Sequence, residues 1–101
     1  MIQVRLVFQA KFGKAADLVA LMKDYNDWEA PPGIPGPRSV RLLTDLSGPF
    51  DTVVQELEYD SFEAWEKGQA AMFAHPRAQE MMERTRDLIA GGSKEYFTVE
   101  A

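Results

Sequence analysis

The sequence predicts an α+β domain in which a four-stranded antiparallel sheet carries its helices on one face. Two observations predict this class. Four stretches have the apolar pattern of strands, and the stretches after the first and third repeat apolar residues every three or four positions, which is typical of amphipathic helices. With 101 residues, 46% of them hydrophobic and 27% charged, the chain has the size and composition of one domain spanning residues 1–101.

The first strand and the first helix are predicted from the N-terminal third. Apolar and more polar residues alternate from Ile2 to Gln9, which indicates a strand with one strongly apolar face. Gly13 marks a break, and helical spacing then runs from Ala15 to about Trp28. The helix must end there, because the proline-rich segment 30–37 lacks the amide donors that a continued helix needs.

The middle of the chain is predicted to form a β-hairpin. From Arg38 to Leu43 the pattern is extended, and a second β pattern follows from Thr52 to Tyr59. Turn-forming residues at 47–50 separate the two strands. We therefore expect a hairpin with a loop of four or five residues.

A second helical region follows the hairpin. Asp60 is a candidate N-cap, and Glu63 three residues later would complete a capping box. Apolar residues then recur at helical spacing from Phe62 to Phe73. This pattern predicts that a helix begins directly after the third strand.

The second helical region is predicted to be bent or split, because the pair His75-Pro76 interrupts it before a second apolar stripe at 78–89. Gly91-Gly92 would end the helix, and Glu95–Val99 has the pattern of a last strand. The element order is βαββαβ. This order predicts a ferredoxin-like fold with both helical regions on one face of the sheet.

The opposite face of this sheet has no covering element in the sequence. By alternation it carries a mixture of apolar and charged side chains: Arg5, Val7, Gln9, Arg41, Leu43, Val54, Glu56 and Glu58. A chain this short also leaves roughly a third of its unfolded surface exposed. A second copy packed on this face would enclose a semi-polar cavity, and we therefore expect a homodimer through the sheet face.

With this element order, the chain resembles the dimeric α+β barrel superfamily, and within it the NIPSNAP-like and antibiotic-biosynthesis-monooxygenase-like small proteins. The resemblance covers nearly the whole chain and rests on three segments: VRLVFQAKFGK, LLTDLSGPFDTVVQELEYDSFEAWE and MFAHPRAQEMMERTRDLIAGGSKEYFTVE. It implies a homodimer whose two sheets close a barrel around a pocket. Members of the superfamily include cofactor-free oxygenases, haem-degrading enzymes, isomerases and many proteins of unknown role, so the fold leaves the function open.

His75 is the candidate catalytic residue, because it is the only histidine and its side chain could transfer a proton or contact a haem. The alternative is that His75, before Pro76, only caps a helix. Trp65 precedes His75 by ten residues, a separation similar to that of the tryptophan and histidine of haem-degrading relatives. Those relatives place an asparagine on the first strand, where this chain has Gln3 and Gln9. Trp65 is also a candidate ligand-binding residue, with core packing as the alternative.

The remaining ligand-binding candidates lie on the uncovered sheet face, where they would line a barrel pocket: Arg5, Gln9, Arg41, Glu56 and Glu58. The alternative is a set of cross-strand ion pairs that bind no ligand. Tyr59 and Tyr96 could donate hydrogen bonds inside a barrel, or simply pack.

Charge and composition exclude several classes of function. The net charge of −5 opposes nucleic acids and acidic membranes, and no apolar run approaches the roughly 20 residues of a membrane span. The N-terminus has the pattern of a strand and not of a signal peptide. Because the chain has no cysteine, a reducing cytoplasm is the expected compartment.

The chain has no phosphate-binding glycine loop, GxSxG, HExxH or CxxC motif, so we expect no metal site and no cofactor. The leading hypothesis is a homodimeric barrel protein that binds a small, largely apolar organic molecule, with any chemistry being cofactor-free oxygenation or isomerisation. The first alternative is a non-catalytic self-association module whose barrel is filled by its own side chains. The second is a haem-binding or haem-degrading monooxygenase.

Overall fold

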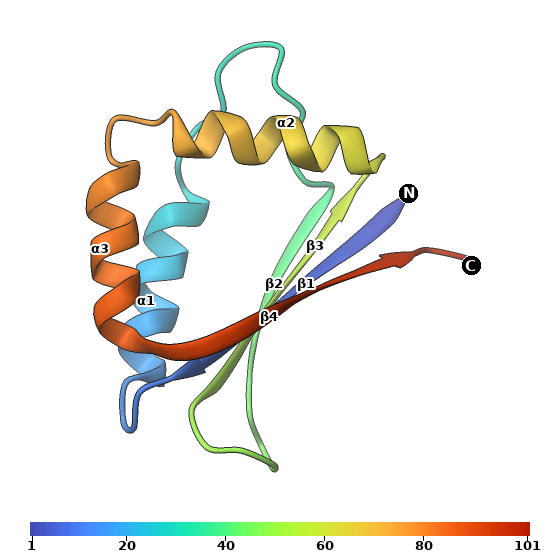
Figure 1. Ribbon diagram of the computed structural model, residues 1–101. Helices are drawn as coiled ribbons and strands as arrows, with labels where there is room; N and C mark the ends of the chain where they lie inside the picture. Colours follow the sequence, from blue (N-terminus) through green and yellow to red (C-terminus); the bar gives the residue numbers. More distant parts are fainter.

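The computed structural model describes residues 1–101 and confirms the predicted α+β fold (Figure 1). Four strands form one antiparallel sheet, and the second helical region is split into two helices, as the pair His75-Pro76 predicts. In chain order the elements are β1 (Ile2–Ala10), α1 (Ala15–Asn26), β2 (Ser39–Thr44), β3 (Thr52–Tyr59), α2 (Phe62–Phe73), α3 (Ala78–Leu88) and β4 (Ile89–Thr98).

The strand order is β2-β3-β1-β4, which is the ferredoxin-like arrangement. β1 is central, and Leu6 pairs with Gln55 on one side and with Lys94 on the other. Side chains of paired residues point to the same face of the sheet. All three helices lie on the face that carries Leu6 and Val4, and Val4 is completely buried there (Figure 1).

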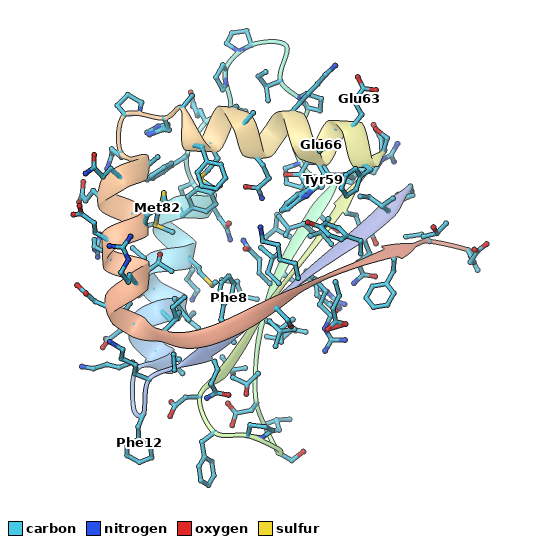
Figure 2. All side chains as sticks on the ribbon, viewed as in Figure 1. Phe8, Phe12, Tyr59, Glu63, Glu66 and Met82 are labelled. Carbon is cyan, nitrogen blue, oxygen red and sulfur yellow. The ribbon has the colours of Figure 1, made fainter.

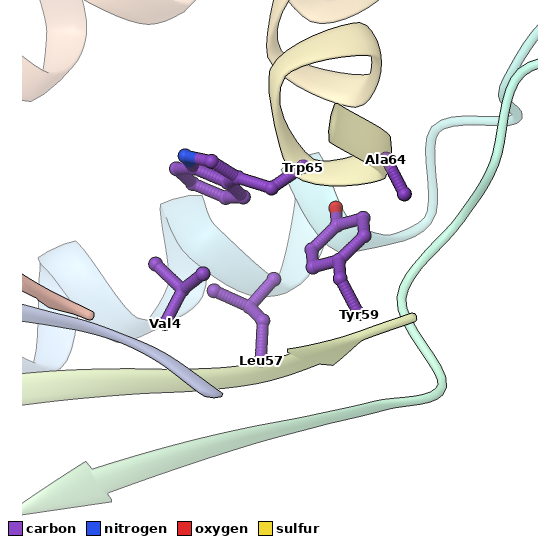
Figure 3. Close-up of a cluster of buried hydrophobic side chains, with 5 residues drawn as sticks. All are labelled: Val4, Leu57, Tyr59, Ala64 and Trp65. Atoms are coloured by element: carbon purple, nitrogen blue, oxygen red, sulfur yellow. The ribbon is translucent and has the colours of Figure 1, made fainter. Parts of the chain in front are cut away.

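The core beneath the helices is made of two clusters. One lies under α2 and consists of Val4, Leu57, Tyr59, Ala64 and Trp65 (Figure 3). The other lies under α1 and consists of Ala10, Leu18, Met22 and Val53. On β3, Gln55 lies between Val53 and Leu57 on the same face, and it is the only polar residue among the buried ones. The core is therefore interrupted at Gln55.

α1 ends at Asn26, two residues before the predicted end at Trp28. The backbone N–H of Trp28 still donates to the carbonyl of Tyr25, at 3.0 Å, so the chain continues for one more turn outside the helix. This turn directs the Trp28 ring toward His75, which lies between α2 and α3.

The predicted capping box of α2 is wrong. The N-cap is Ser61, whose Oγ accepts a hydrogen bond from the N–H of Ala64 at 3.1 Å. Asp60 forms an ion pair with Arg38 instead, and Glu63 lies 3.0 Å from Lys67 on the helix surface. The pattern of Asp60 and Glu63 is misleading because the N-cap of α2 lies one residue later than the pattern requires, at Ser61.

The hairpin loop is longer than predicted, because it spans residues 45–51 between β2 and β3. Asp45 closes the loop by accepting a hydrogen bond from the N–H of Thr52 at 3.0 Å. Asp51, in the left-handed region at φ 59°, accepts one from the N–H of Gly13 at 2.9 Å. The extra residues thus tie the hairpin to the turn after β1.

Gly91 and Gly92 do not end a helix, contrary to prediction. The helix ends at Leu88, and the two glycines lie inside β4, paired with Gln9 and Phe8. A Cβ atom on Gly92 would lie only 2.6 Å from the carbonyl oxygen of Val7, whereas one on Gly91 would meet nothing within 4 Å. Gly92 therefore permits the close approach of β4 to β1.

We expect Gly92→Ala to lower the free energy of unfolding by about 1–3 kcal/mol, because the new methyl group must push β4 away from β1. The matched control is Gly91→Ala, which should change stability by less than about 0.5 kcal/mol. Urea unfolding of the two variants measures both values. Equal effects would show that the contact with Val7 does not constrain the strand pair.

Candidate functional site

A cavity of about 890 Å³ lies between the sheet and the three helices and is open to solvent on one side. β1 contributes Leu6 and Phe8, and β3 contributes Gln55, Leu57 and Tyr59. The remaining walls come from all three helices, the proline-rich segment, Val40 of β2, and Ile89 and Lys94 of β4. Figure 2 shows Phe8, Tyr59 and Met82 directed toward this space, whereas Phe12 points away from it. The cavity is thus on the helix side of the sheet, within one copy of the chain, whereas the predicted barrel pocket would form on the opposite face between two copies.

The proline-rich segment 30–37 forms one wall of this cavity. It passes close to α2, where the carbonyl oxygen of Pro35 lies 3.5 Å from the position of a Cβ atom on Gly68. The hydroxyl of Tyr59 lies 3.4 Å from the same position. A glycine at position 68 therefore leaves space for both the segment and the tyrosine.

One polar cluster of the cavity consists of Tyr25, Asn26, Gln55 and Tyr59. Gln55 Nε2 donates a hydrogen bond to Asn26 Oδ1 at 2.9 Å. Because this bond uses only the amide oxygen of Asn26, the side-chain N–H groups of Asn26 remain as donors. Burial, with a smaller contribution from Tyr59, raises the pKa of Tyr25 to about 12. Burial also raises the pKa of Tyr59. Both phenols therefore stay protonated at neutral pH and can donate hydrogen bonds to a bound molecule.

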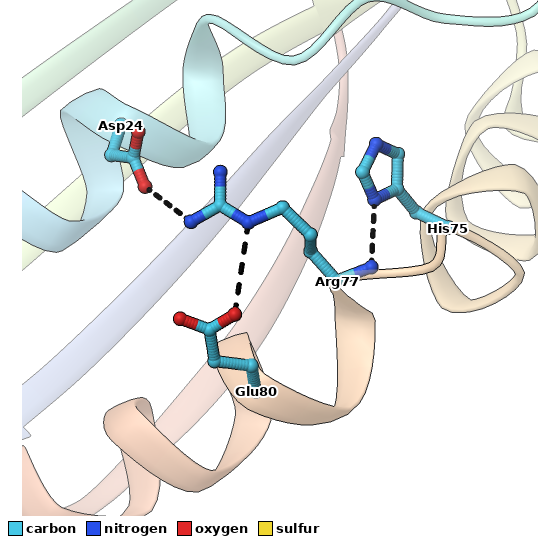
Figure 4. Close-up of polar contacts among 4 residues, drawn as sticks. All are labelled: Asp24, His75, Arg77 and Glu80. Carbon is cyan, nitrogen blue, oxygen red and sulfur yellow. Dashed lines mark hydrogen bonds and ion pairs between the residues drawn. The ribbon is translucent and has the colours of Figure 1, made fainter.

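A second group of side chains lies where α1, α2 and α3 meet. The Trp28 ring stacks on the His75 ring with centroids 4.1 Å apart, and Tyr25 packs edge-on against Trp28 at 5.0 Å. The Arg77 guanidinium lies 5.3 Å from the Trp28 ring and reaches Asp24 at 3.4 Å (Figure 4). These contacts connect α1 to the turn between α2 and α3.

His75 has a defined hydrogen bond in this group. Its Nδ1 accepts the backbone N–H of Arg77 at 3.0 Å, so the proton of the neutral ring is on Nε2 (Figure 4). In this state Nε2 can donate a hydrogen bond to a ligand, but it has no lone pair for a proton or for haem iron. Either role would require His75 to give up its bond to Arg77.

The predicted site residues divide between the two faces of the sheet. Trp65 and His75 line the cavity, and Trp65 is also part of the core, as its alternative interpretation predicts. The other five candidates are on the opposite face by the strand register: Arg5, Gln9, Arg41, Glu56 and Glu58. Glu56 lies between Arg5 and Arg41 in the sheet register, and among these five only Arg41 and Glu56 form an ion pair, at 2.6 Å. Gln9 Nε2 donates to the carbonyl of Phe50 and so holds the hairpin loop.

Sequence reasoning did not identify four of the polar and aromatic cavity residues described above as site residues: Tyr25, Asn26, Trp28 and Gln55. Tyr25 and Trp28 follow the apolar stripe of α1 and so have the pattern of core residues. Gln55 does carry a signal in the sequence, because it is a polar residue on the face of β3 that otherwise bears Val53, Leu57 and Tyr59.

No group of three or more histidine, cysteine, aspartate or glutamate side chains is placed to hold a metal ion. None of the helices combines the length and the apolar character needed to cross a bilayer.

The raised pKa of Tyr25 predicts a loss of stability at alkaline pH. Because the pKa is higher in the folded chain than its ordinary value of 10.0, the stability from the neutral phenol is present below pH 10 and is lost as the pH rises toward about 12. We expect Tyr25→Phe to reduce this loss, measured by urea unfolding below pH 10 and near pH 12. The control Tyr96→Phe, at a position 44% exposed, should retain it. An identical loss in Tyr25→Phe would contradict the assignment.

No protein-family model matches the sequence, and a search of curated proteins gave no match either. Solved structures do match its fold, at sequence identities below 20%. An uncharacterized NIPSNAP domain protein from Burkholderia xenovorans superposes with a TM-score of 0.78 and 18% identity, over 100% of this chain and 96% of that one. A candidate antibiotic biosynthesis monooxygenase from Chloroflexus aurantiacus superposes with a TM-score of 0.70 and 19% identity, over 100% of this chain and 96% of that one.

SnoaB from Streptomyces nogalater, described as a cofactor-independent oxygenase, superposes with a TM-score of 0.73 and 15% identity, over 99% of this chain and 93% of that one. Likeness at this level of identity concerns the fold alone. The chain therefore has the fold of NIPSNAP domain proteins and antibiotic-biosynthesis-monooxygenase-like proteins, as the resemblance in its sequence predicts.

Proposed function

We propose that this chain binds a small, largely apolar organic molecule in the cavity between the sheet and the helices. The observation that carries the proposal is the cavity itself, whose volume of about 890 Å³ is in the range of small-molecule sites. Its walls are mainly apolar and aromatic, and they include a cluster of hydrogen-bonding groups around Gln55. This combination provides burial for an apolar body and hydrogen bonds for one polar end.

The polar cluster favours a ligand with an oxygen acceptor, such as a carbonyl or a quinone. Tyr25 and Tyr59 are kept neutral by burial and are donors, and the amide N–H groups of Asn26 add to them. Trp28, stacked on His75 at one side of the cavity, offers an aromatic surface for a planar ring. We infer that a planar aromatic molecule with a carbonyl oxygen fits this cavity best.

Cofactor-free oxygenation of the bound molecule is the chemistry that we propose, with isomerisation as the second candidate. It is supported by the fold shared with SnoaB, a cofactor-independent oxygenase, and by neutral phenols that can stabilise negative charge on a substrate oxygen. Oxygen uptake separates the two candidates, because only oxygenation consumes dioxygen. A dihydroxynaphthalene is a suitable probe substrate, since it is planar, electron-rich and small enough for the cavity.

The proposed site is tested with N-phenylnaphthylamine, an uncharged apolar fluorophore. Ala71 of α2 lines the cavity, so the larger side chain of Ala71→Leu should extend into it and weaken binding about tenfold. Ala70, the preceding residue of the same helix, is exposed and does not line the cavity, so Ala70→Leu is the matched control. Fluorescence titration measures both affinities. Absence of binding to the unmodified chain, or equal weakening in both variants, would refute the site.

We further propose that the chain forms a homodimer through the sheet face opposite the helices. At this face Leu43 is 38% and Phe97 48% exposed, and Arg5 Nε is buried without a hydrogen-bond partner. A second copy would cover the two apolar side chains and can supply an acceptor to Arg5. The self-association module remains the alternative function: it predicts the same dimer but no binding of N-phenylnaphthylamine.

Sedimentation velocity tests the dimer. We expect a dimer at micromolar concentration, and we expect Leu43→Glu to convert it to a monomer because a buried carboxylate would lack a partner. Leu46→Glu is the control, since Leu46 is fully exposed in the hairpin loop. A monomeric unmodified chain at this concentration would disprove the interface.

A further inference from the structure

We propose that the molecule bound in the cavity is an organic acid whose carboxylate pairs with Lys94 and Arg86 at the edge formed by α3 and β4. This inference rests on the proposed function and specifies its ligand. It adds a charged end to an otherwise apolar, aromatic molecule. The distribution of charge around the cavity supports it.

The charge of the cavity wall is opposite to that of the chain. The chain carries 16 acidic and 11 basic residues, for a net charge of −5. Of the acidic residues only Glu29 lines the cavity, whereas Arg86 and Lys94 both do. The wall therefore has a positive charge within a negative protein, and an anion is attracted to this region more than to the rest of the surface.

Lys94 and Arg86 also have no partner within the chain. Five other basic residues form ion pairs, namely Lys14, Arg38, Arg41, Lys67 and Arg77. Neither Lys94 nor Arg86 forms an ion pair or a side-chain hydrogen bond, so both charges are available to a ligand.

The strand register places Lys94 on the helix side of the sheet. Lys94 pairs with Leu6, and Leu6 lines the same cavity. Arg86 is in the last turn of α3, which leads directly into β4. Both residues are exposed, so a carboxylate bound there keeps part of its hydration while the apolar part of the ligand enters the cavity. The alternative is that Lys94, which lies on the edge strand β4, serves only to prevent another chain from pairing with this strand. In that case the cavity would show no preference for an acid over an uncharged ligand.

The test compares naphthoate with its uncharged amide, naphthamide, which has almost the same shape. Competition against N-phenylnaphthylamine measures both affinities at neutral pH, at low and at high salt. The test variant is the double change Lys94→Gln, Arg86→Gln. The control is Lys11→Gln, Arg84→Gln, which has the same net charge but removes two exposed cations that do not line the cavity and form no ion pair. All four positions are exposed, so the variants should fold.

We expect the unmodified chain to prefer naphthoate by about threefold or more, and salt to weaken naphthoate binding because it screens a local attraction. The preference should disappear in the test variant and persist in the control. Equal binding of the two probes, tighter binding of naphthamide, or an equal loss in both variants would overturn the inference and leave the cavity site intact. If neither probe nor N-phenylnaphthylamine binds, the proposed function fails as well.

Discussion

The pairing of β1 with both of its neighbours is the constraint on which the rest of the structure depends. Its register turns Val4, Leu6 and Phe8 toward the helices and leaves Arg5 and Val7 on the opposite face. A shift by one residue would exchange these two sets and bury Arg5 in the core. Gly92 strengthens the constraint, because only a residue without a side chain lets β4 approach Val7 so closely. The position of every cavity residue on β1, β3 and β4 follows from this register.

The cavity results from the way in which the helices cover the sheet. α2 packs on the end of β3 near Leu57, and α1 packs near Val53. Gln55 lies between these two areas, where an apolar residue would have joined the two clusters into one core. Instead its side chain is bonded to Asn26, and space remains beside it. The break at His75-Pro76 contributes as well, because it lets α3 turn away from α2 and pack beside α1 (Figure 1).

The sequence predicts five of the seven candidate site residues on the uncovered face of the sheet, where a pocket would form only between two copies of the chain. In the structure that face holds an ion pair between Arg41 and Glu56, while the cavity lies among aromatic and apolar side chains on the other face. Only Trp65 and His75 were predicted and also line the cavity. A cavity within one chain is space that side chains leave unfilled, and its position depends on where the helices end and turn. Periodicity in a sequence shows which face is buried but not how completely it is filled.

The sequence by itself determined the order of the elements, the helix-facing side of the first three strands and the division of the second helical region, because these depend on local periodicity and on residues such as Pro76. Only the tertiary structure decided the N-cap at Ser61, the inclusion of Gly91 and Gly92 in β4, and the cavity around Gln55. The glycines and the cavity depend on groups that are distant in the chain, and Asp60, which the sequence predicts as the cap, is paired with the distant Arg38. The need for glycine at position 92 comes from the close carbonyl of Val7, and the buried polar side chain of Gln55 is accommodated by its hydrogen bond to Asn26. No local sequence pattern contains either pair.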